Sequence, residues 1–288
     1  MFDPRTARIG FIGAGRLAGS LAVGLCAAGY RVTAVASAGD EAARRLASVI
    51  GAGVSASTSH EVTEGCDLVF LTVPDSAIAA VATGIRWRPG QAVVHCSGAL
   101  GIEALSAAAT AGAMTGCFHP LQSFPSRDGD PNRFHGIVCG VEAEGDLSTA
   151  LDRMTVDLGA HVVRLEGVDR AKYHAAAVFA SNYVVSLMAA AARSWEQAGL
   201  PPDTARSALT PLLLGASQNV AERDLSEALT GPIARGDTAT VERHLAALAE
   251  PDLRELYRRL GAVLLTLDLG HSPETASRLR AILSEEGQ

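Results

Sequence analysis

Polar residues follow an apolar stretch in the segment 115–125, which reads TGCFHPLQSFP. His119 is a candidate acid for proton transfer, because histidine titrates near neutral pH. Pro120 removes a backbone donor and ends the expected strand, so Gln122 and Ser123 should lie on a loop that binds a substrate. Two roles stay open for His119. It gives a proton to the substrate, or it bonds a backbone carbonyl and braces the loop.

A second polar group lies in the alanine-rich segment 174–192, HAAAVFASNYVVSLMAAAA. His174 precedes Ser181 by seven positions and Asn182 by eight, so one face of a helix would carry all three. Hydrogen-bonding groups on so apolar a helix need partners, which are either one another or a wet cleft. We predict a cleft, in which His174 and Asn182 act in catalysis and Ser181 binds the substrate.

Two further segments offer substrate-binding groups. In HCSGAL, Ser97 and Gly98 directly follow an apolar strand, where they would contact a substrate, although Ser97 could instead complete a turn. In TGPIARGD, Arg235 is the best available cation for an anionic substrate, because a guanidinium binds a carboxylate through two hydrogen bonds. The alternatives for Arg235 are an ion pair with Asp237 and a plain surface charge. Asp237 or Thr238 is a natural N-cap for the next helix.

A metal site is not expected among the histidines and cysteines. A metal site could be imagined from four residues: His95, Cys96, Cys117 and His119. However, His95 and Cys96 are adjacent on one expected strand, so their side chains point to opposite faces and cannot easily bind one ion together. The chain has five cysteines without CxxC spacing, which fits free thiols in a reducing cytoplasm.

A glycine-rich turn stands between the first expected strand and the first expected helix, in RIGFIGAGRLAGSLA. Gly13 permits a tight turn, Gly15 lets the backbone approach a pyrophosphate, and the small Ala18 lets helix and strand pack closely. Free backbone N–H groups and the helix dipole then bind the anion. The strand–turn–helix context predicts a dinucleotide site. It comprises Gly13, Ala14, Gly15, Arg16, Leu17 and Ala18.

The end of the second strand favours NADP over NAD. A carboxylate that would bind the ribose hydroxyls of NAD is replaced there by Ser37, and Asp40 is as well explained as a helix N-cap. Arg44 or Arg45 could bind a 2′-phosphate, or both could be solvated. The segment TVPDSAI would line the ribose and nicotinamide, with an N-cap role also open for its aspartate. Its contact residues would be Thr72, Val73, Pro74 and Asp75.

Short β-branched runs alternate with alanine-rich helical runs over the first half of the chain. This alternation predicts an α/β fold with a Rossmann-type doubly wound, mostly parallel sheet, followed by an all-helical C-terminal domain. The domains are expected at residues 1–165, which bind NAD(P), and 166–288, which bind substrate and form a dimer. Residues 173–199 are expected to form one long helix, and further helices are expected at 204–222, 238–249, 253–267 and 273–283.

Composition limits the classes of partner. The 288 residues are 48% hydrophobic and 19% charged, which predicts a large core and little disorder. A net charge of −7 argues against nucleic acid and anionic membranes, both of which attract clustered Lys and Arg. The N-terminal sequence MFDPRTARIGFIG has no signal-peptide pattern, and the segment 174–192 is expected to be a buried helix of a soluble domain rather than a membrane span. A cytoplasmic protein is predicted.

The order of GFIGAGRLA, LTVPD and HCSGAL, followed by a helical domain that opens on a long helix, resembles the 6-phosphogluconate-dehydrogenase-like superfamily. That group includes β-hydroxyacid dehydrogenases, pyrroline-5-carboxylate reductases and ketopantoate reductases. FHPLQSF, YHAAAVFASNY and TGPIARGD resemble an uncharacterised family that joins a Rossmann-like domain to a helical domain of unknown function. The resemblance implies an NADP-dependent oxidoreductase and a helical domain that builds a homodimer.

The sequence departs from β-hydroxyacid dehydrogenases at one catalytic pair. HCSGAL and CFHPLQS occupy the places where β-hydroxyacid dehydrogenases hold the substrate carboxylate. Those enzymes carry a lysine and an asparagine one helical turn apart on the long helix, whereas here Ala176 stands one turn after Lys172. Two functions therefore stay open. One is hydride transfer to or from a small carbonyl or imine bearing a carboxylate, of the ketopantoate or pyrroline-carboxylate type. The other is a dinucleotide-binding sensor or scaffold without turnover.

Overall fold

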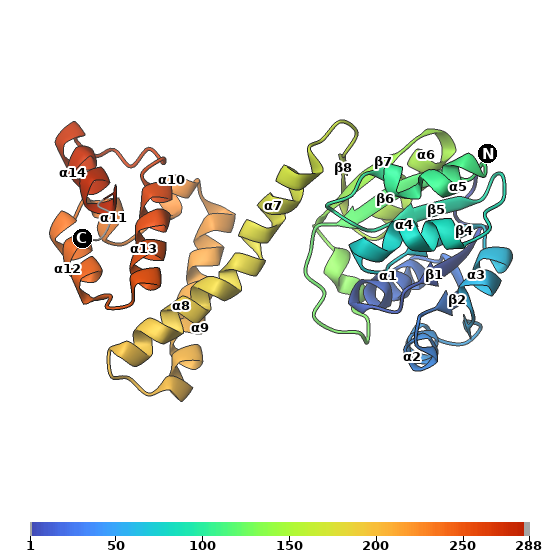
Figure 1. Ribbon diagram of the computed structural model, residues 1–288, viewed down its shortest axis with the longest axis horizontal. Helices are drawn as coiled ribbons and strands as arrows, with labels where there is room; N and C mark the ends of the chain where they lie inside the picture. The colour runs from blue at the N-terminus through green and yellow to red at the C-terminus, as the bar shows by residue number, and fades with distance from the viewer. Residues whose placement is uncertain (1, 285–288) are drawn as a thin grey trace. The chain divides into compact units, whose positions relative to one another are not determined.

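The computed structural model describes residues 2–284 of the chain, which divide into two compact units, Met1–Ser181 and Asn182–Gln288. The first unit is built on one eight-stranded sheet with the order β3-β2-β1-β4-β5-β6-β7-β8 (Figure 1). The order reverses between β1 and β4, as it does in doubly wound folds. The strands are β1 Arg8–Ile12, β2 Arg31–Ala36, β3 Ser55–Ala56, β4 Leu68–Leu71, β5 Ala92–His95, β6 Met114–Pro120, β7 Val138–Ala143 and β8 His161–Arg164.

All neighbouring strands from β3 through β6 run parallel, whereas β7 runs antiparallel to β6 and parallel to β8. The mostly parallel, doubly wound sheet expected from the sequence is therefore confirmed. The direction of β7 follows from its connection, because residues 121–137 include only a short 3₁₀ turn, η2 Pro131–Phe134, and no crossover helix.

Helices cover both faces of this sheet (Figure 1). One face packs against α1, α2 and α6, and the other against α3, α4 and α5 with the 3₁₀ turn η1. On the first face Phe70 lies between Phe11 and Phe118, with ring centroids at 5.3 and 6.1 Å. The helices of the unit are α1 Arg16–Ala27, α2 Asp40–Ile50, α3 Ser59–Gly65, α4 Asp75–Gly84, η1 Ile102–Leu105, α5 Ser106–Thr110, α6 Gly145–Asp157 and α7 Arg170–Ala180.

The described part of the second unit, residues 182–284, is helical throughout its regular structure, which confirms the expected all-helical C-terminal region. Its small core joins α11, α12 and α14, with Val241 and Leu279 fully buried. The short helices α10 and α11 were not anticipated from the sequence. The helices are α8 Asn182–Gln197, α9 Pro202–Glu222, α10 Leu225–Ala228, α11 Pro232–Arg235, α12 Thr238–Ala247, α13 Pro251–Leu264 and α14 Pro273–Ser284.

The single long helix expected over 173–199 is instead two helices, α7 and α8, which is a correction. Ser181 separates them with φ −128° and ψ −65°, outside the helical range, while its hydroxyl donates to the carbonyl of Ala177 at 2.8 Å. A serine that bonds the preceding turn in this way disturbs a helix. The two compact units also divide at Ser181. The change from alternating strands and helices to helices alone comes earlier in the sequence, where β8 ends at Arg164.

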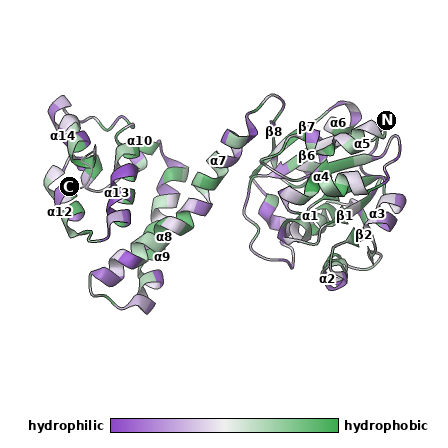
Figure 2. Ribbon diagram, in the orientation of Figure 1, coloured by the Kyte–Doolittle hydropathy of each residue, from purple (hydrophilic) through white to green (hydrophobic). Residues whose placement is uncertain are grey.

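The expectation of a buried helix over 174–192 is also wrong for the single chain. Neither α7 nor α8 contains a buried residue, because α7 contacts the α/β unit through its first turn and α8 packs along α9. Figure 2 shows the hydrophobic residues that α8 and α9 carry. Among the described residues, Arg170–Gln197 is long and apolar enough to cross a membrane by length and composition alone.

Helix starts differ from two of the three expectations. Gly39 and Pro74 occupy the N-cap positions of α2 and α4, so Asp40 and Asp75 stand in the first turns rather than at the caps. There the positive end of each helix dipole still stabilises the negative charge of the carboxylate. Asp237 caps α12 as expected, since its carboxylate accepts from the backbone N–H of Thr240.

Candidate functional site

The glycine-rich turn joins β1 to α1 and has the geometry of a phosphate loop. Gly13 has φ +112°, and a Cβ placed there would lie 2.5 Å from the backbone C and O of Thr72. Its N–H donates to the carbonyl of Ala36 at 2.8 Å, and its carbonyl accepts from the Thr72 hydroxyl at 2.7 Å. Gly13 is thus required by the protein's own backbone, and Thr72 braces the turn.

No contact with residues 2–284 requires a glycine at position 15. It caps α1 in an extended conformation with φ −82°, and an added Cβ would meet only the carbonyl oxygen of Thr72 at 3.8 Å. The first turn of α1 has no acidic side chain, and its N–H groups have no intrahelical partner. The open space at Gly15 together with these donors fits a dinucleotide pyrophosphate, so the residues present suit the cofactor.

The other residues of the turn are placed as this role requires. Ala18 is fully buried against the sheet, and Leu17 packs on the core beside it. Ala14 is half-buried and Arg16 is exposed as the first residue of α1. The turn therefore presents backbone rather than bulky side chains above its glycines.

The end of β2 opens into a depression of about 400 Å³ that holds the residues expected to select the cofactor. Ser37 and Arg44 both line it, together with the hydroxyl-bearing residues 57–59. Arg45 does not, because it is ion-paired with Asp128 and lowers the pKa of that carboxyl. The two neighbouring arginines therefore differ in their surroundings, since only Arg44 faces the hollow. Arg44 makes no hydrogen bond or ion pair with any described residue and lines a hydroxyl-rich hollow.

At the end of β4, Val73 is half-buried while Pro74 and Asp75 are exposed at the start of α4. The Asp75 carboxylate lies near enough to act on the pKa values of His95 and His119, which it raises against the opposing effect of burial. The carboxyl ends of β4, β5 and β6 therefore come together at one edge of the sheet.

His95 ends β5 fully buried and acts as a structural support. The backbone N–H of Ser97 donates to its Nδ1 at 3.2 Å, and its Nε2–H donates to the carbonyl of Gly101 at 3.1 Å. Burial lowers the pKa of His95 to about 4, so the ring is neutral. The Ser97 hydroxyl accepts from the N–H groups of Ala99 and Leu100, both at 3.2 Å. Ser97 therefore completes a turn, one of the two alternatives left open by the sequence.

His119, near the end of β6, is the centre of a polar cluster. A Cβ on Gly98 would lie 2.7 Å from its Cε1 and Nε2, so the ring covers the chain where it leaves β5. On its other side, His119 Nδ1 is 2.9 Å from the hydroxyl of Tyr173 on α7. His174 is next to it, with ring centroids 6.3 Å apart, and the buried His174 Nδ1 has no hydrogen-bond partner in the described part of the chain. Burial first, and then the charge of His174, lower the pKa of His119 to about 4.

The first turn of α7 is fastened to the sheet by an ion pair. Arg170 pairs with Glu142 of β7, and only 10% and 16% of the two side chains is exposed. Its other guanidinium nitrogen donates to Cys117 Sγ at 3.6 Å. Lys172 points away, 86% exposed and paired with Asp169 at 2.9 Å. The lysine that the resemblance would make an acid is therefore a solvated surface charge.

The remaining predicted site residues lie on other elements of the chain. Gln122 and Ser123 are exposed after β6, where the Ser123 N–H donates to the Gln122 side chain at 2.8 Å. Ser181 and Asn182 are exposed at the break between α7 and α8, so the shared face expected for them with His174 does not continue as one helix. Arg235 is exposed at the end of α11, and Asp237 is engaged as a cap instead of pairing with it.

No group of three or more His, Cys, Asp and Glu side chains within residues 2–284 is placed to hold a metal ion. Burial raises the pKa of Cys117 to about 11, so this thiol stays protonated. Its S–H donates to the carbonyl of Ser97 at 3.3 Å. The residue is thus part of the packing behind the cluster.

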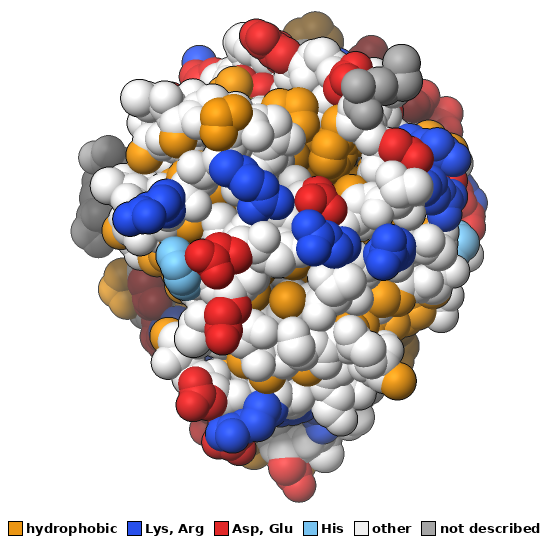
Figure 3. All heavy atoms as spheres, turned by 90° about the vertical axis from the view of Figure 1, so that its right-hand side faces the viewer, with side chains coloured by type: hydrophobic (Ala, Val, Ile, Leu, Met, Phe, Trp, Pro, Cys, Tyr) orange, Lys and Arg blue, Asp and Glu red, His pale blue; other side chains and the backbone are white. Residues whose placement is uncertain are grey.

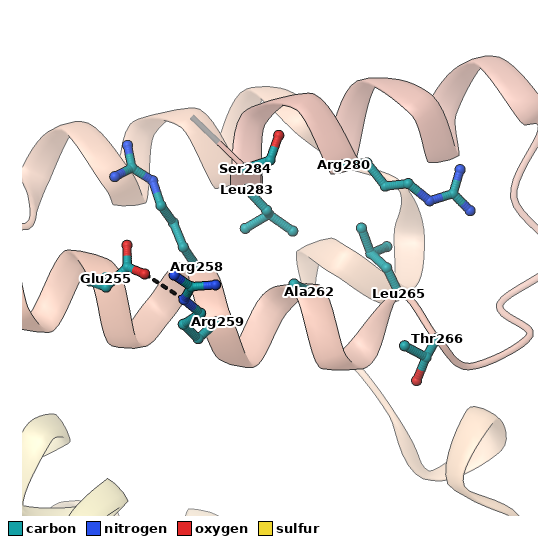
Figure 4. Close-up of a pocket in the computed structure, with 9 residues that line it drawn as sticks. All are labelled: Glu255, Arg258, Arg259, Ala262, Leu265, Thr266, Arg280, Leu283 and Ser284. Carbon is teal, nitrogen blue, oxygen red and sulfur yellow. Dashed lines mark hydrogen bonds and ion pairs between the residues drawn. The ribbon is translucent and has the colours of Figure 1, made fainter. Parts of the chain in front are cut away.

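A separate cavity of about 390 Å³ lies between α13 and α14 of the helical unit (Figure 4). Arg258, Arg259 and Arg280 line it, and Arg259 is paired with Glu255 at 2.5 Å. None of the residues predicted from the sequence lines this cavity. Of the functional candidates, His119 and His174 lie together with Tyr173 at the sheet edge of the α/β unit.

Comparison with known proteins agrees with this location. Residues 8–98 match the family described as NADP oxidoreductase coenzyme F420-dependent, and residues 137–263 match a domain of unknown function, DUF2520. No curated protein matches the chain. The α/β unit is thus similar over residues 8–98 to an NADP oxidoreductase family, and the two matches together fit the two-domain arrangement inferred from the motifs.

Solved structures extend the likeness over nearly the whole chain. A Bacteroides fragilis protein described as an NADP oxidoreductase is 28% identical, with 91% of this chain and 99% of that one aligned at a TM-score of 0.73. A Thermotoga maritima protein is 26% identical over 94% and 99%, at 0.68. A pyrroline-5-carboxylate reductase from Coxiella burnetii is 20% identical over 96% and 98%, at 0.59, and shares the fold.

Sequence reasoning missed Tyr173 and Arg170. Both precede the alanine-rich segment by a few residues, and Tyr173 begins the motif YHAAAVFASNY that was quoted for its resemblance. Their partners are 54 and 28 positions away, and no local pattern indicates such pairings. Arg170 and Tyr173 are three residues apart, the spacing of one helical face, which was the available signal.

Proposed function

We propose that the protein is an NADP-dependent oxidoreductase that transfers a hydride to or from a small carbonyl or imine bearing a carboxylate. The observation that carries this proposal is the space at Gly15, which nothing in the protein requires, beside unpaired helix N–H groups. A bound nicotinamide dinucleotide would supply the hydride. The polar cluster of His119, Tyr173 and His174 lies at the same edge of the sheet, as ligand sites in open α/β sheets do.

The preference for NADP over NAD is part of this proposal. Ser37 stands where a carboxylate would bind the ribose of NAD, and Arg44 lines the same hollow without an ion-pair partner among the described residues. A guanidinium there suits a 2′-phosphate, since it offers several donors and a full charge. Calorimetric titration with NADPH and NADH tests this preference directly.

The substrate is proposed to be a ketopantoate-type 2-oxo acid or a pyrroline-carboxylate-type imine, the substrate types implied by the resemblance of the motifs to the 6-phosphogluconate-dehydrogenase-like superfamily. His174 and Asn182 are proposed catalytic residues, and His119 is proposed either to transfer the proton itself or to brace the group that does. Reduction of a panel of oxo acids and cyclic imines by NADPH tests the reaction class. The proposed substrate contacts also include the Ser97 hydroxyl, which accepts two backbone N–H groups in its turn and still has its own hydrogen to donate. The others are Gly98, Gln122, Ser123, Ser181 and Arg235.

One observation favours a second function, a dinucleotide-binding sensor or scaffold. Lys172 in the first turn of α7 is solvated and paired with Asp169, so no lysine is placed to act as the acid that β-hydroxyacid dehydrogenases use. A sensor would bind NADPH tightly and oxidise none of it with any member of the panel. Substrate-dependent oxidation of NADPH would exclude this alternative.

A homodimer through the helical unit is proposed from its exposed apolar surface. Val185 on α8 and Leu212 on α9 are each 72% exposed, and Val263 on α13 is 64% exposed. Leu212 and Val263 also line an apolar hollow of about 750 Å³ together with α10. Exposed apolar area of this extent is typical of an interface, and a second copy of the chain would cover it.

We further propose a cytoplasmic protein without a membrane or nucleic-acid partner. The apolar stretch Arg170–Gln197 begins with an arginine whose ion pair with Glu142 fixes it to the folded α/β unit, which does not suit a membrane span. Figure 3 shows acidic and basic side chains interspersed over the described part of one face, without a continuous basic patch. Binding to anionic vesicles or duplex DNA would contradict this proposal.

A further inference from the structure

The hydrogen bond between His119 and Tyr173 holds the tyrosine hydroxyl at the end of β6. The two atoms, His119 Nδ1 and Tyr173 Oη, are 2.9 Å apart, and the rings meet edge to face with centroids at 5.5 Å. The hydroxyl also lies over Gly140 of β7, where an added Cβ would come within 2.9 Å of it. His119 and Gly140 are paired across the two strands. The hydroxyl therefore stands directly above the sheet.

Rigid elements set this position. Asp169 caps α7 by accepting from the backbone N–H of Lys172, and Arg170 joins the same turn to Glu142 of β7. Tyr173 follows Arg170 by three residues, so the ion pair and the hydroxyl face the sheet together. On the far side of His119, Gly98 leaves room for the ring at the exit from β5. A hydroxyl fixed by a helix and a sheet keeps its direction better than one on a loop.

The protonation states of the pair suit a neutral donor. Burial, followed by repulsion from His174, lowers the pKa of His119 to about 4, so the imidazole is neutral and has no excess proton to give at neutral pH. Burial raises the pKa of Tyr173 to about 12, so its hydroxyl keeps its proton. Arg170 disfavours and Asp75 favours a positive charge on His119, and neither exceeds the effect of burial.

We propose that Tyr173 gives the proton to a carbonyl substrate, and that His119 is a positioning residue whose Nδ1–H donates to the tyrosine oxygen. This inference rests on the proposed oxidoreductase function. With Nδ1–H donating to Oη, the hydrogen of the tyrosine hydroxyl is left for the substrate.

The step balances with these groups alone once hydride has been added to the carbonyl carbon. The π pair of the C=O bond moves onto oxygen, the Oη–H bond of Tyr173 breaks, and the O–H bond of the product alcohol forms. The tyrosine oxygen left behind keeps the hydrogen bond from His119 Nδ1–H. It regains its proton from water, directly or through the imidazole, whose Nε2 takes a proton as Nδ1 gives one.

The inference distinguishes two classes of substrate. A carbonyl oxygen becomes an alkoxide on reduction and needs a proton. A protonated cyclic imine becomes a neutral amine when it accepts a hydride and needs no donor. Loss of the Tyr173 hydroxyl should therefore lower carbonyl reduction and spare imine reduction by the same protein.

The test compares Tyr173→Phe with Tyr257→Phe. Tyr257 forms a matched pair with His244 in the helical unit, with the same 2.9 Å between Oη and Nδ1 and perpendicular rings. Tyr173→Phe should lower kcat for a 2-oxo acid by about 10²- to 10⁴-fold, the usual effect of losing a general acid. The melting temperature, the Kd for NADPH and the kcat for a cyclic imine should stay near those of the unaltered protein. Tyr257→Phe should change none of the four.

Nitrogen NMR of the histidine rings gives a second readout that needs no turnover. The inference predicts a neutral His119 with its proton on Nδ1, and a proton on Nε2 would overturn it. Carbonyl reduction by Tyr173→Phe within about threefold of the unaltered protein would overturn it while leaving the oxidoreductase proposal intact. An equal loss with the cyclic imine would also overturn it, since that pattern means a structural role. Failure of the unaltered protein to oxidise NADPH with any substrate would overturn both proposals.

Discussion

Replacing Gly15 by alanine should separate cofactor binding from folding. The added Cβ would lie 3.8 Å from its nearest neighbour, and φ −82° is open to alanine. Alanine is a poorer N-cap than glycine, at a cost of up to about 1 kcal/mol. Reduced freedom of the unfolded chain offsets this by about 0.4–1 kcal/mol. The free energy of unfolding should therefore change by less than about 1 kcal/mol.

Binding of NADPH should respond far more strongly. A methyl group at Gly15 would fill the space through which phosphate oxygens reach the N–H groups of the first turn of α1. Each hydrogen bond to a charged group is worth about 1.5–3 kcal/mol, so losing one of them weakens binding about ten- to hundredfold. Calorimetric titration measures the Kd, and thermal unfolding of the same samples measures stability.

Gly13→Ala is the matched control, because here the protein itself opposes a side chain. The Cβ would come 2.5 Å from the Thr72 backbone at a φ of +112°, so stability should fall by about 3 kcal/mol. If Gly15→Ala bound NADPH as tightly as the unaltered protein, the phosphate site would be misplaced. If Gly13→Ala were as stable as the unaltered protein, the steric reasoning would be refuted.

Three further predictions concern specificity, pH and assembly. Arg44→Ala should lower the ratio of NADPH to NADH affinity by about tenfold or more, measured by calorimetry, whereas Arg45→Ala, which removes the partner of Asp128, should not. Stability should fall as pH drops from about 6.5 toward 4, because His95 and His119 stay neutral in the folded protein down to about pH 4 while the unfolded chain takes up protons below about 6.5. His95 accounts for at most about 3 kcal/mol, and His95→Gln should flatten the decline in unfolding measurements across that range. Leu212→Glu should give a monomer in sedimentation, whereas Ser207→Glu on the same helix should leave a dimer; a monomeric unaltered protein would contradict the proposed interface.

The parallel sheet and the tight glycine turn between β1 and α1 could be predicted from the sequence because both depend on short-range patterns. Apolar strand runs alternate with helical runs, and the spacing of Gly13, Gly15 and Ala18 is readable within one turn. The helical character of the second unit was equally clear, since no β-branched run follows residue 165. The direction of β7 was not predicted, although its connection from β6, which contains no crossover helix, indicates it.

The polar cluster could be predicted only in part. His119 and His174 were singled out by type, but the partner of His119 is Tyr173, whose approach depends on how α7 meets β6 and β7. The break at Ser181 was missed because alanine-rich runs lie on both sides of it, at 175–177 and 189–192, and a single serine gives little local warning. Arg44 and Arg45 are neighbours in the chain, and only the pairing of Arg45 with Asp128 separates their roles.

The most direct test of the proposed function is the loss of nicotinamide absorbance when NADPH is mixed with the protein and a panel of oxo acids and cyclic imines, ketopantoate and pyrroline-5-carboxylate first. The proposed reductase should oxidise NADPH in a saturable, substrate-dependent way with at least one of them, and oxidise NADH more weakly. Tight binding of NADPH without any substrate-dependent loss of absorbance across the panel would contradict the proposal of an enzyme. It would favour the alternative of a dinucleotide-binding sensor or scaffold. Failure to bind either dinucleotide would contradict the assignment of the site itself.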